Sequence, residues 1–486
     1  MHLFERLSGG ICALVAVVAL AALVAGGAPA LAQSEMDEGS AVEELRREVE
    51  RLKAEVEELK ASKSEEDSEM ASEEGMESGP ADAAEGLAAR LEEIERRIAI
   101  LAEESERREI GEAAVMADES ELGFGPAASK IYRTEQGLSI GGYGEMLYEN
   151  FESERDDGAD SDATDELDFL RGIVYFGYKF NDNWLFNSEI EFEHASTGEE
   201  GSASVEFAYL DYLWKPELNA RAGLLLVPMG FVNELHEPTV FLGARRPDVE
   251  SRIIPTTWRE NGFGLFGEVG PVSYRTYIVN GLEGAEFSGG GLRGGRQKGS
   301  KAIAEDFAWV GRIDYEPVPG LLLGGSAYVG DSGQGLTTAA GEEVDLTTTI
   351  LEGHAEWRWR GLELRFLGAR ADLDDAALFN RATGLTGSSS VGEELSGWYA
   401  QAGYDVLSRT GSGHELIPYV RWEELDTQDS VPAGFTRNPA NDQESLTLGL
   451  AWKPFPQAIV KADYQDYDNG AGTGLDQLNV ALGYIF

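Results

Sequence analysis

Two glycine-rich motifs in this sequence have the spacing of catalytic or nucleotide-binding sites. Residues 137–141 spell the G-x-S-x-G of a serine nucleophile elbow, and residues 262–267 spell the G-x-G-x-x-G of a dinucleotide-binding loop. Both sites require a helix directly after the motif, but each motif lies in an alternating, strand-like stretch. An esterase would also need a base near Ser139. We therefore expect small residues in a strand wall, and predict neither an enzyme nor a cofactor.

Histidine and acidic residues give no recognisable metal-ligand spacing. The acidic run at 156–165 lacks the fixed glycine and the bidentate glutamate of a calcium loop, so a solvated surface loop is expected, with weak divalent-cation binding as the alternative. The single cysteine, Cys12, lies in the apolar N-terminal stretch. Four histidines are far apart in the remaining chain: His194, His236, His354 and His414. We predict no metal site from this spacing.

The connection at residues 231–260 is the most informative segment. It carries more apolar bulk than a water-exposed loop needs: Phe231, Phe241, Ile253, Ile254 and Trp258. We expect this loop to fold inward and narrow a lumen. Its arginines would then lie near the constriction, where fixed charges set ion preference: Arg245, Arg246, Arg252 and Arg259. The alternative is that they pair with carboxylates on an outer rim.

The elements that would position these arginines are strands. From about residue 138 the apolar residues recur with a period of two, and about sixteen candidate strands follow. Their connections alternate between short turns, such as Gly270-Pro271, and long polar loops, such as residues 151–166. This alternation is typical of a transmembrane β-barrel. Aromatic residues near the short turns indicate a girdle at one membrane interface: Trp184, Tyr212, Trp214, Tyr315, Trp359, Trp452 and Phe486.

The N-terminal quarter has a different composition. Residues 1–32 have the basic start, apolar run and Ala30-Leu31-Ala32 ending of a secretory signal. Within 33–110, valines and leucines alternate at heptad spacing, which predicts a short coiled coil with a flexible linker, with partnerless amphipathic helices as the alternative. No later run is apolar enough for a spanning helix. The predicted domains are thus 1–32, 33–110 and an all-β barrel at 131–486.

Residues 130–486 resemble the phosphate-selective porins O and P. The resemblance lies in SIGGYGEMLY, LDFLRGIVYFGYKFNDNW, AYLDYLWKPELNARAGLLLVPMGF and, most specifically, IIPTTWRENGFGLFGE. It implies a sixteen-stranded barrel, a homotrimer and an arginine-lined lumen that passes phosphate or other anions. The sequence departs from that pattern in two ways. LLLVPMG follows Gly223 where polar or basic residues are expected, and 88 acidic residues outnumber 39 basic ones.

The choice between anions and cations therefore stays open at the level of sequence. Inward-facing candidates of the wall include Arg171, Arg221 and Arg312, but also Glu189 and Glu191, whose field would favour cations. The expected function is a passive outer-membrane channel for small hydrophilic solutes or ions. The alternative is a structural protein that tethers the membrane to peptidoglycan through a periplasmic coiled coil.

The C-terminal stretch DQLNVALGYIF reads as the closing strand of the barrel. Its alternate residues are apolar up to the last one, and we expect Tyr484 and Phe486 to serve as a signal for the barrel assembly machinery. The expected partners are this machinery, outer-membrane lipid and two further copies of the chain, with no nucleic acid.

Overall fold

The computed structural model describes residues 117, 119–195 and 201–486. The predicted signal peptide and coiled coil lie outside these residues, so both stay predictions. Within the described part of the chain, no helix has the length and apolar character to cross a membrane.

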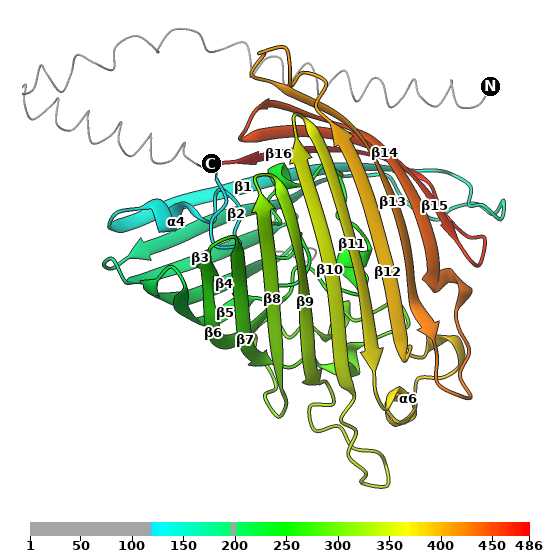
Figure 1. Cartoon of the computed structure of the whole chain (residues 1–486). Coiled ribbons are helices and arrows are strands. Elements are labelled where there is room, and N and C mark those ends of the chain that lie inside the picture. Colours follow the sequence, from blue (N-terminus) through cyan, green and yellow to red (C-terminus); the bar gives the residue numbers. More distant parts are fainter. Residues whose placement is uncertain (1–116, 118, 196–200) are drawn as a thin grey trace, which may run out of the picture. The chain divides into compact units, whose positions relative to one another are not determined.

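Sixteen antiparallel strands form one closed barrel in which each strand pairs with its sequence neighbours. The ring closes between β1 and β16, where Tyr143 pairs with Ile485 (Figure 1). This confirms the predicted fold class and strand number. The strands are β1 (Gly137–Phe151), β2 (Glu166–Lys179), β3 (Trp184–Glu193), β4 (Ala203–Lys215), β5 (Leu218–Leu226), β6 (Arg259–Val269), β7 (Val272–Asn280), β8 (Phe307–Val318), β9 (Leu321–Asp331), β10 (Thr347–Trp359), β11 (Leu362–Leu373), β12 (Glu394–Tyr404), β13 (Glu415–Ser430), β14 (Asp442–Phe455), β15 (Ala458–Asn469) and β16 (Gln477–Ile485).

The two faces of the wall differ in polarity because successive side chains of a strand point to opposite sides. On β14, Leu448 and Leu450 are exposed on the outside, whereas Thr447 is buried inside. The outer face carries many exposed apolar side chains, and the inner face carries charged and polar ones. The aromatic girdle is present on the outside: Trp184, Tyr212, Trp214, Tyr315, Trp359 and Phe486 are exposed, and Trp452 is half-buried.

The connections are short at one end of the barrel and long at the other, as the sequence predicts. We call these the turn end and the loop end. At the turn end, the turn glycines Gly270, Gly320 and Gly361 have φ values of 59°, 83° and 86°, which other residues adopt with difficulty. Both motifs with catalytic spacing lie in strands, β1 and β6. Neither is followed by a helix.

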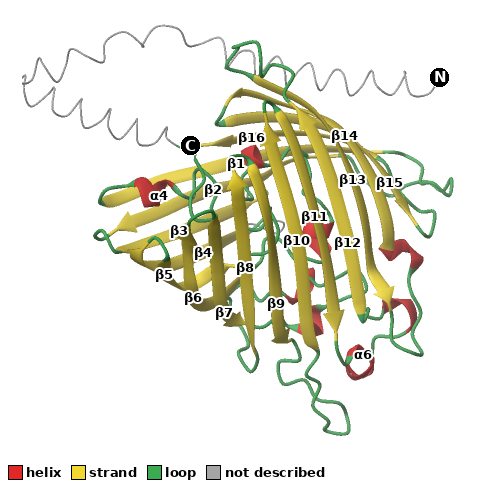
Figure 2. Cartoon of the chain, in the orientation of Figure 1, coloured by secondary structure: helices red, strands yellow, loops and turns green. Residues whose placement is uncertain are grey.

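Short helices occur only in the connections and in the segment before β1 among the described residues (Figure 2). They are α4 (Lys130–Arg133), η1 (Pro238–Val240), α5 (Val249–Arg252), η2 (Gly284–Glu286), η3 (Arg293–Gly295), α6 (Ala376–Thr383), η4 (Gly387–Ser389) and η5 (Pro439–Asn441). The connections and the segment before β1 that fold into the barrel are the ones that matter for function.

Candidate functional site

The connection between β5 and β6, residues 227–258, crosses the inside of the barrel. We call it the constriction loop. It starts from one side of the wall and is held by strands on the other side. The amide of Ala244 donates to Asp463 Oδ2 on β15 at 2.7 Å, and Lys461 Nζ donates to the carbonyl of Gly243 at 2.9 Å. The amide of Val249 donates to Glu423 Oε1 on β13 at 2.6 Å.

Burial of its apolar side chains gives this loop its position. The five apolar residues singled out in the sequence are all at most 4% exposed: Phe231, Phe241, Ile253, Ile254 and Trp258. Glu250 of α5 adds a polar anchor. Its two oxygens accept from Tyr399 Oη at 2.6 Å and from the amide of Val232 at 2.7 Å. Burial raises the pKa of Glu250.

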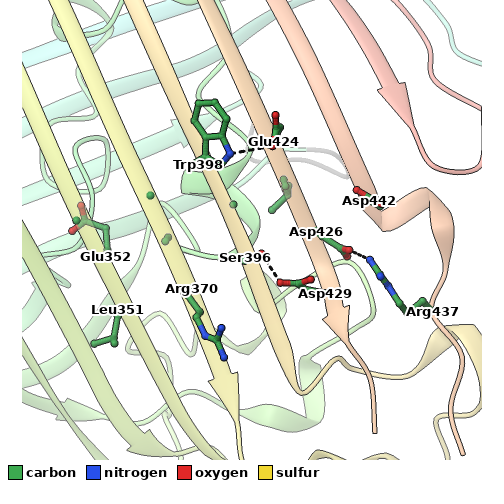
Figure 3. A pocket seen from close by; sticks show the side chains of 15 residues that line it. Leu351, Glu352, Arg370, Ser396, Trp398, Glu424, Asp426, Asp429, Arg437 and Asp442 are labelled. Atoms are coloured by element: carbon green, nitrogen blue, oxygen red, sulfur yellow. Dashed lines mark hydrogen bonds and ion pairs between the residues drawn. The ribbon is translucent and has the colours of Figure 1, made fainter. Parts of the chain in front are cut away.

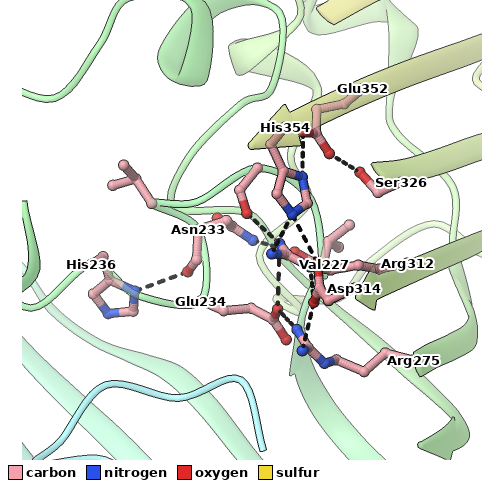
Figure 4. A network of polar contacts seen from close by, with 12 residues as sticks. Val227, Asn233, Glu234, His236, Arg275, Arg312, Asp314, Ser326, Glu352 and His354 are labelled. Carbon is pink, nitrogen blue, oxygen red and sulfur yellow. Dashed lines mark hydrogen bonds and ion pairs between the residues drawn. The ribbon is translucent and has the colours of Figure 1, made fainter. Parts of the chain in front are cut away.

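A buried polar network fastens the start of the loop to β7, β8 and β10 (Figure 4). Arg312 Nε donates to Asp314 Oδ2 at 2.8 Å, and Arg275 Nη2 donates to the same oxygen at 3.1 Å. Glu234 of the loop contacts Arg275 directly, and Arg312 donates to the carbonyl of Gly230. These charges neutralise one another, so this part of the wall is structural.

The four predicted constriction arginines do not share one environment. Arg245 is exposed and forms an ion pair with Glu149 at 3.1 Å, while Arg252 lies 3.8 Å from Asp248. Arg259 is the first residue of β6 and is buried in an ion pair with Glu206 at 3.0 Å. Arg246 forms no ion pair with any described carboxylate, and its hydrogen bond goes to a backbone carbonyl 3.5 Å away.

The predicted pore-wall arginines all point inward, but two of them do not line open water. Arg221 is 3% exposed, forms a bidentate pair with Asp211 at 2.8 and 2.9 Å, and stacks on Phe124 and Tyr209. Arg312 belongs to the buried network. Segments inside the barrel cover both side chains, so their role as pore-wall residues stays a prediction. Arg171 lies between Glu145 at 3.3 Å and Glu191 at 3.8 Å.

Sequence reasoning missed two arginines in the loop between β7 and β8, residues 281–306. This loop also turns inward, since Thr427 Oγ1 on β13 donates to the carbonyl of Gly289 at 2.6 Å. Burial, with the charges of Arg246 and Arg171, lowers the pKa of Arg293 to about 10. Burial, with the charges of Arg293 and Arg259, lowers that of Arg296 to about 9. The basic run RGGRQK was the available signal.

Arg246, Arg293 and Arg296 together form what we call the arginine cluster. None of them forms an ion pair within the described residues, and their side chains are partly or well exposed. Burial, followed by the charge of Arg171, lowers the pKa of Arg246 as well. A guanidinium stays protonated at neutral pH even in such surroundings. The cluster is therefore a concentration of uncompensated positive charge beside the constriction loop.

Two buried glutamates of the adjoining wall have a cationic partner. His236 Nε2 lies 3.0 Å from Glu189 Oε1 and 3.3 Å from Glu206 Oε2, and all three side chains are buried. Although burial opposes it, the charge of these glutamates raises the pKa of His236 to about 10. Glu189 and Glu206 are thus paired with a cation.

A second element inside the barrel is the segment before β1, residues 117 and 119–133, which we call the inner segment. Phe124 is 1% exposed and packs on Tyr209, and Tyr132 Oη donates to Asp211 Oδ2 at 2.8 Å. Glu237 of the constriction loop accepts from the amides of Ala127 and Ala128 at 2.9 to 3.1 Å. The two elements therefore support each other.

A depression of about 760 Å³ lies on the wall of β10 to β14 towards the loop end (Figure 3). Arg437 contacts Asp426, Trp398 Nε1 donates to Glu424 Oε2 at 3.1 Å, and Ser396 Oγ donates to Asp429. One ion pair, Arg437 with Asp426, joins two of its charged lining residues. No residue of the arginine cluster lines it.

Comparison with known proteins gives one similar sequence and several similar folds. An uncharacterized protein of Aquifex aeolicus (strain VF5) is 38% identical over 375 residues, which is 75% of this chain and 83% of that protein. No model of a known protein family matches the chain. The resemblance to porins O and P therefore stays a prediction.

The solved structures with a similar fold are outer-membrane proteins. OmpF of Salmonella typhi in complex with daunomycin is 13% identical, covers 73% of this chain and 99% of its own, and has a TM-score of 0.48. The channel DcaP of Acinetobacter baumannii is 11% identical, with 72% and 97% covered and a TM-score of 0.47. An anion-selective porin from Comamonas acidovorans is 13% identical, with 72% and 100% covered and a TM-score of 0.42. Similarity this low says nothing about a shared solute.

Proposed function

Since this chain belongs to the same family as the Aquifex aeolicus protein, which is described only as uncharacterized, we propose a function from the geometry itself. The protein is an outer-membrane porin that lets small hydrophilic anions diffuse passively past the constriction loop. An outward apolar face with an aromatic girdle suits a lipid bilayer, and an inward polar face suits water.

The observation that carries the preference for anions is the arginine cluster. The chain as a whole is strongly acidic, with a formal net charge of -49. If this overall charge decided selectivity, the channel would prefer cations. Selectivity, however, is set at the narrowest part of a pore, where low-dielectric walls focus the field of nearby charges. Beside the constriction loop, Arg246, Arg293 and Arg296 are uncompensated, whereas Glu189 and Glu206 are paired with His236 and Arg259.

Phosphate is the anion that the resemblance to porins O and P suggests, and the site is compatible with it. Guanidinium groups match phosphate oxygens in geometry and bind them through paired N–H donors. Three such groups beside one constriction would favour a multivalent anion over chloride. We also propose a homotrimer, as the same resemblance implies.

The test is planar-bilayer conductance of the purified full-length protein under a salt gradient, followed by phosphate titration. We expect conductance steps, a reversal potential of the anion sign and a chloride current that falls as phosphate is added. Absence of steps would disprove the channel. A cation-signed potential would leave the channel in place and remove the anion preference, and an unaffected chloride current would remove phosphate alone.

A further inference from the structure

The fold brings together three metal-ligating side chains that are far apart in the sequence. Glu189 of β3, Glu206 of β4 and His236 of the constriction loop place one ligand atom each within 4.8 Å of the others. All three are at most 2% exposed. Because the spacing along the sequence gave no hint of a site, only closure of the wall and inward folding of the loop create this group.

The separations suit ligands of one ion. Nε2 of His236 lies 3.0 Å from the nearer oxygen of Glu189 and 3.3 Å from Oε2 of Glu206. Two ligands bound to zinc at about 2.0–2.1 Å in tetrahedral geometry are roughly 3.3 Å apart. A small rotation of the side chains would open the centre to an ion without moving the backbone.

The imidazole of His236 has the orientation that is usual for a histidine bound to a metal ion. Nδ1 of His236 lies 2.9 Å from the carbonyl oxygen of Asn233, which can only accept, so Nδ1 carries a proton. Nε2 then faces two carboxylates, and a bare lone pair there would be repelled by both. It must hold a cation, which is either a proton or a metal ion. A backbone carbonyl on the opposite ring nitrogen is the usual support of a ligating histidine.

Two buried polar atoms at this place make no hydrogen bond. Oε2 of Glu206 has only its ion-pair contact with His236, the hydroxyl of Tyr143 has no hydrogen-bond partner, and both residues are at most 1% exposed. The ring of Tyr143 lies 6.1 Å from the His236 ring. The other oxygen of Glu206 accepts from Arg259 Nη1 at 3.0 Å. Buried polar atoms are seldom left unsatisfied, so these point to a ligand.

We propose that Glu189, Glu206 and His236 form a binding site for a divalent transition-metal cation such as Zn²⁺. One imidazole and two carboxylates are a ligand set that zinc accepts, with a position left for a further oxygen ligand. The ion would join the constriction loop to β3 and β4 and add positive charge beside the arginine cluster. The site does not depend on the solute that the channel passes.

The first experiment measures zinc bound to the purified full-length protein after chelator treatment and re-addition of Zn²⁺, by calorimetry and elemental analysis. We expect one tightly bound ion per chain in the wild type. His236→Gln and Glu206→Gln should each lose it. His414→Gln, which removes an exposed histidine of a turn, should keep it. Equal zinc binding by His236→Gln and His414→Gln would overturn the proposal.

The second experiment needs no variant and so covers the case in which substitutions in the wall prevent folding. Co²⁺ added to the wild-type protein should give the intense d–d absorption of a four- or five-coordinate site with nitrogen and oxygen ligands, and Zn²⁺ should abolish it. Only the weak spectrum of hydrated Co²⁺ would show that a proton alone occupies the position between His236 and the two glutamates, and would refute the metal site.

Discussion

At the scale of single residues, the lumen separates charges that are held in pairs from charges that are left free. Three arginines are buried in ion pairs with carboxylates and so stabilise the fold: Arg221, Arg259 and Arg312. Arg246 and Arg293 have no such partner among the described residues and can act on a passing ion. Selectivity should therefore depend on the second group alone.

Removal of the free charges tests this division. In Arg246→Ala/Arg293→Ala the reversal potential should move toward cations, because the remaining field is that of an acidic chain. The measurement is bilayer conductance under a salt gradient. Arg409→Ala, which removes an exposed arginine from a short turn, is the matched control and should behave as wild type. An unchanged potential in the double variant would argue against the arginine cluster as the selectivity element.

Removal of a paired charge should lower the stability of the barrel and leave its reversal potential unchanged. Arg221→Ala leaves Asp211 buried without its bidentate partner, and breaking a buried ion pair in this way costs about 3–5 kcal/mol. We expect lower resistance of the folded barrel to heat and denaturant, with reversal potential unchanged in the fraction that folds. A large shift in potential with normal stability would return Arg221 to the pore wall.

At the scale of elements, the inner segment and the constriction loop hold each other inside the barrel. Their contact depends on Glu237, which accepts from two consecutive amides of the inner segment. Burial raises the pKa of Glu237, although the two amides work in the opposite direction. Neither element is itself a strand of the wall, so this contact adds to the hydrogen bonds that hold both of them to the strands.

Glu237→Ala should loosen the inner segment. Hydrogen bonds to a charged group contribute about 1.5–3 kcal/mol each. Loss of the bonds from the two amides is therefore enough to favour release of the inner segment from the constriction loop. We expect a higher single-channel conductance and faster proteolysis near residues 117–133. Glu286→Ala, at an exposed position of the neighbouring loop, is the control. Unchanged conductance and proteolysis would show that the other contacts of the segment, such as those of Phe124 and Tyr132, are enough to retain it.

The terminal strand β16 closes the ring up to the last residue. The amide of Phe486 donates to the carbonyl of Gly142 at 2.9 Å, and the amide of Gly142 donates back at 3.0 Å. Phe486→Asp places a charge on the outer face at the closing seam. We expect less protein in the outer membrane, with normal conductance per inserted channel. A normal yield would contradict the role of Tyr484 and Phe486 in assembly.

At the scale of the whole molecule, each face of the barrel has the polarity of the medium that it contacts, which is lipid outside and water inside. Its outer face is apolar between the aromatic girdle and the loop end, while its interior holds the charges. A charge on the outer face should therefore matter according to its depth. Strand β14 offers positions on this face at two depths, Leu448 in the middle and Glu444 near the loop end.

Leu448→Arg should cost about 2–4 kcal/mol, and Glu444→Arg at most about 1 kcal/mol, because the penalty of a cation falls toward the membrane interface. The measurement is folding into lipid vesicles followed by denaturant titration. The two variants share strand, face and introduced residue, so depth is the main difference. Equal costs would contradict a membrane midplane at Leu448.

The sequence by itself determined the barrel. A period of two, strictly alternating connection lengths and aromatics near the turns are local properties, and sixteen strands follow from them because each pairs with its neighbours in sequence. The apolar bulk of residues 231–260 likewise predicted the inward loop. What only the tertiary structure decided is which charges remain free. Pairing of Glu206 with Arg259, the covering of Arg221 by Phe124 and the meeting of Glu189 with His236 join positions distant in sequence. No local pattern encodes such contacts, since they exist only once the wall has closed around the segments inside it.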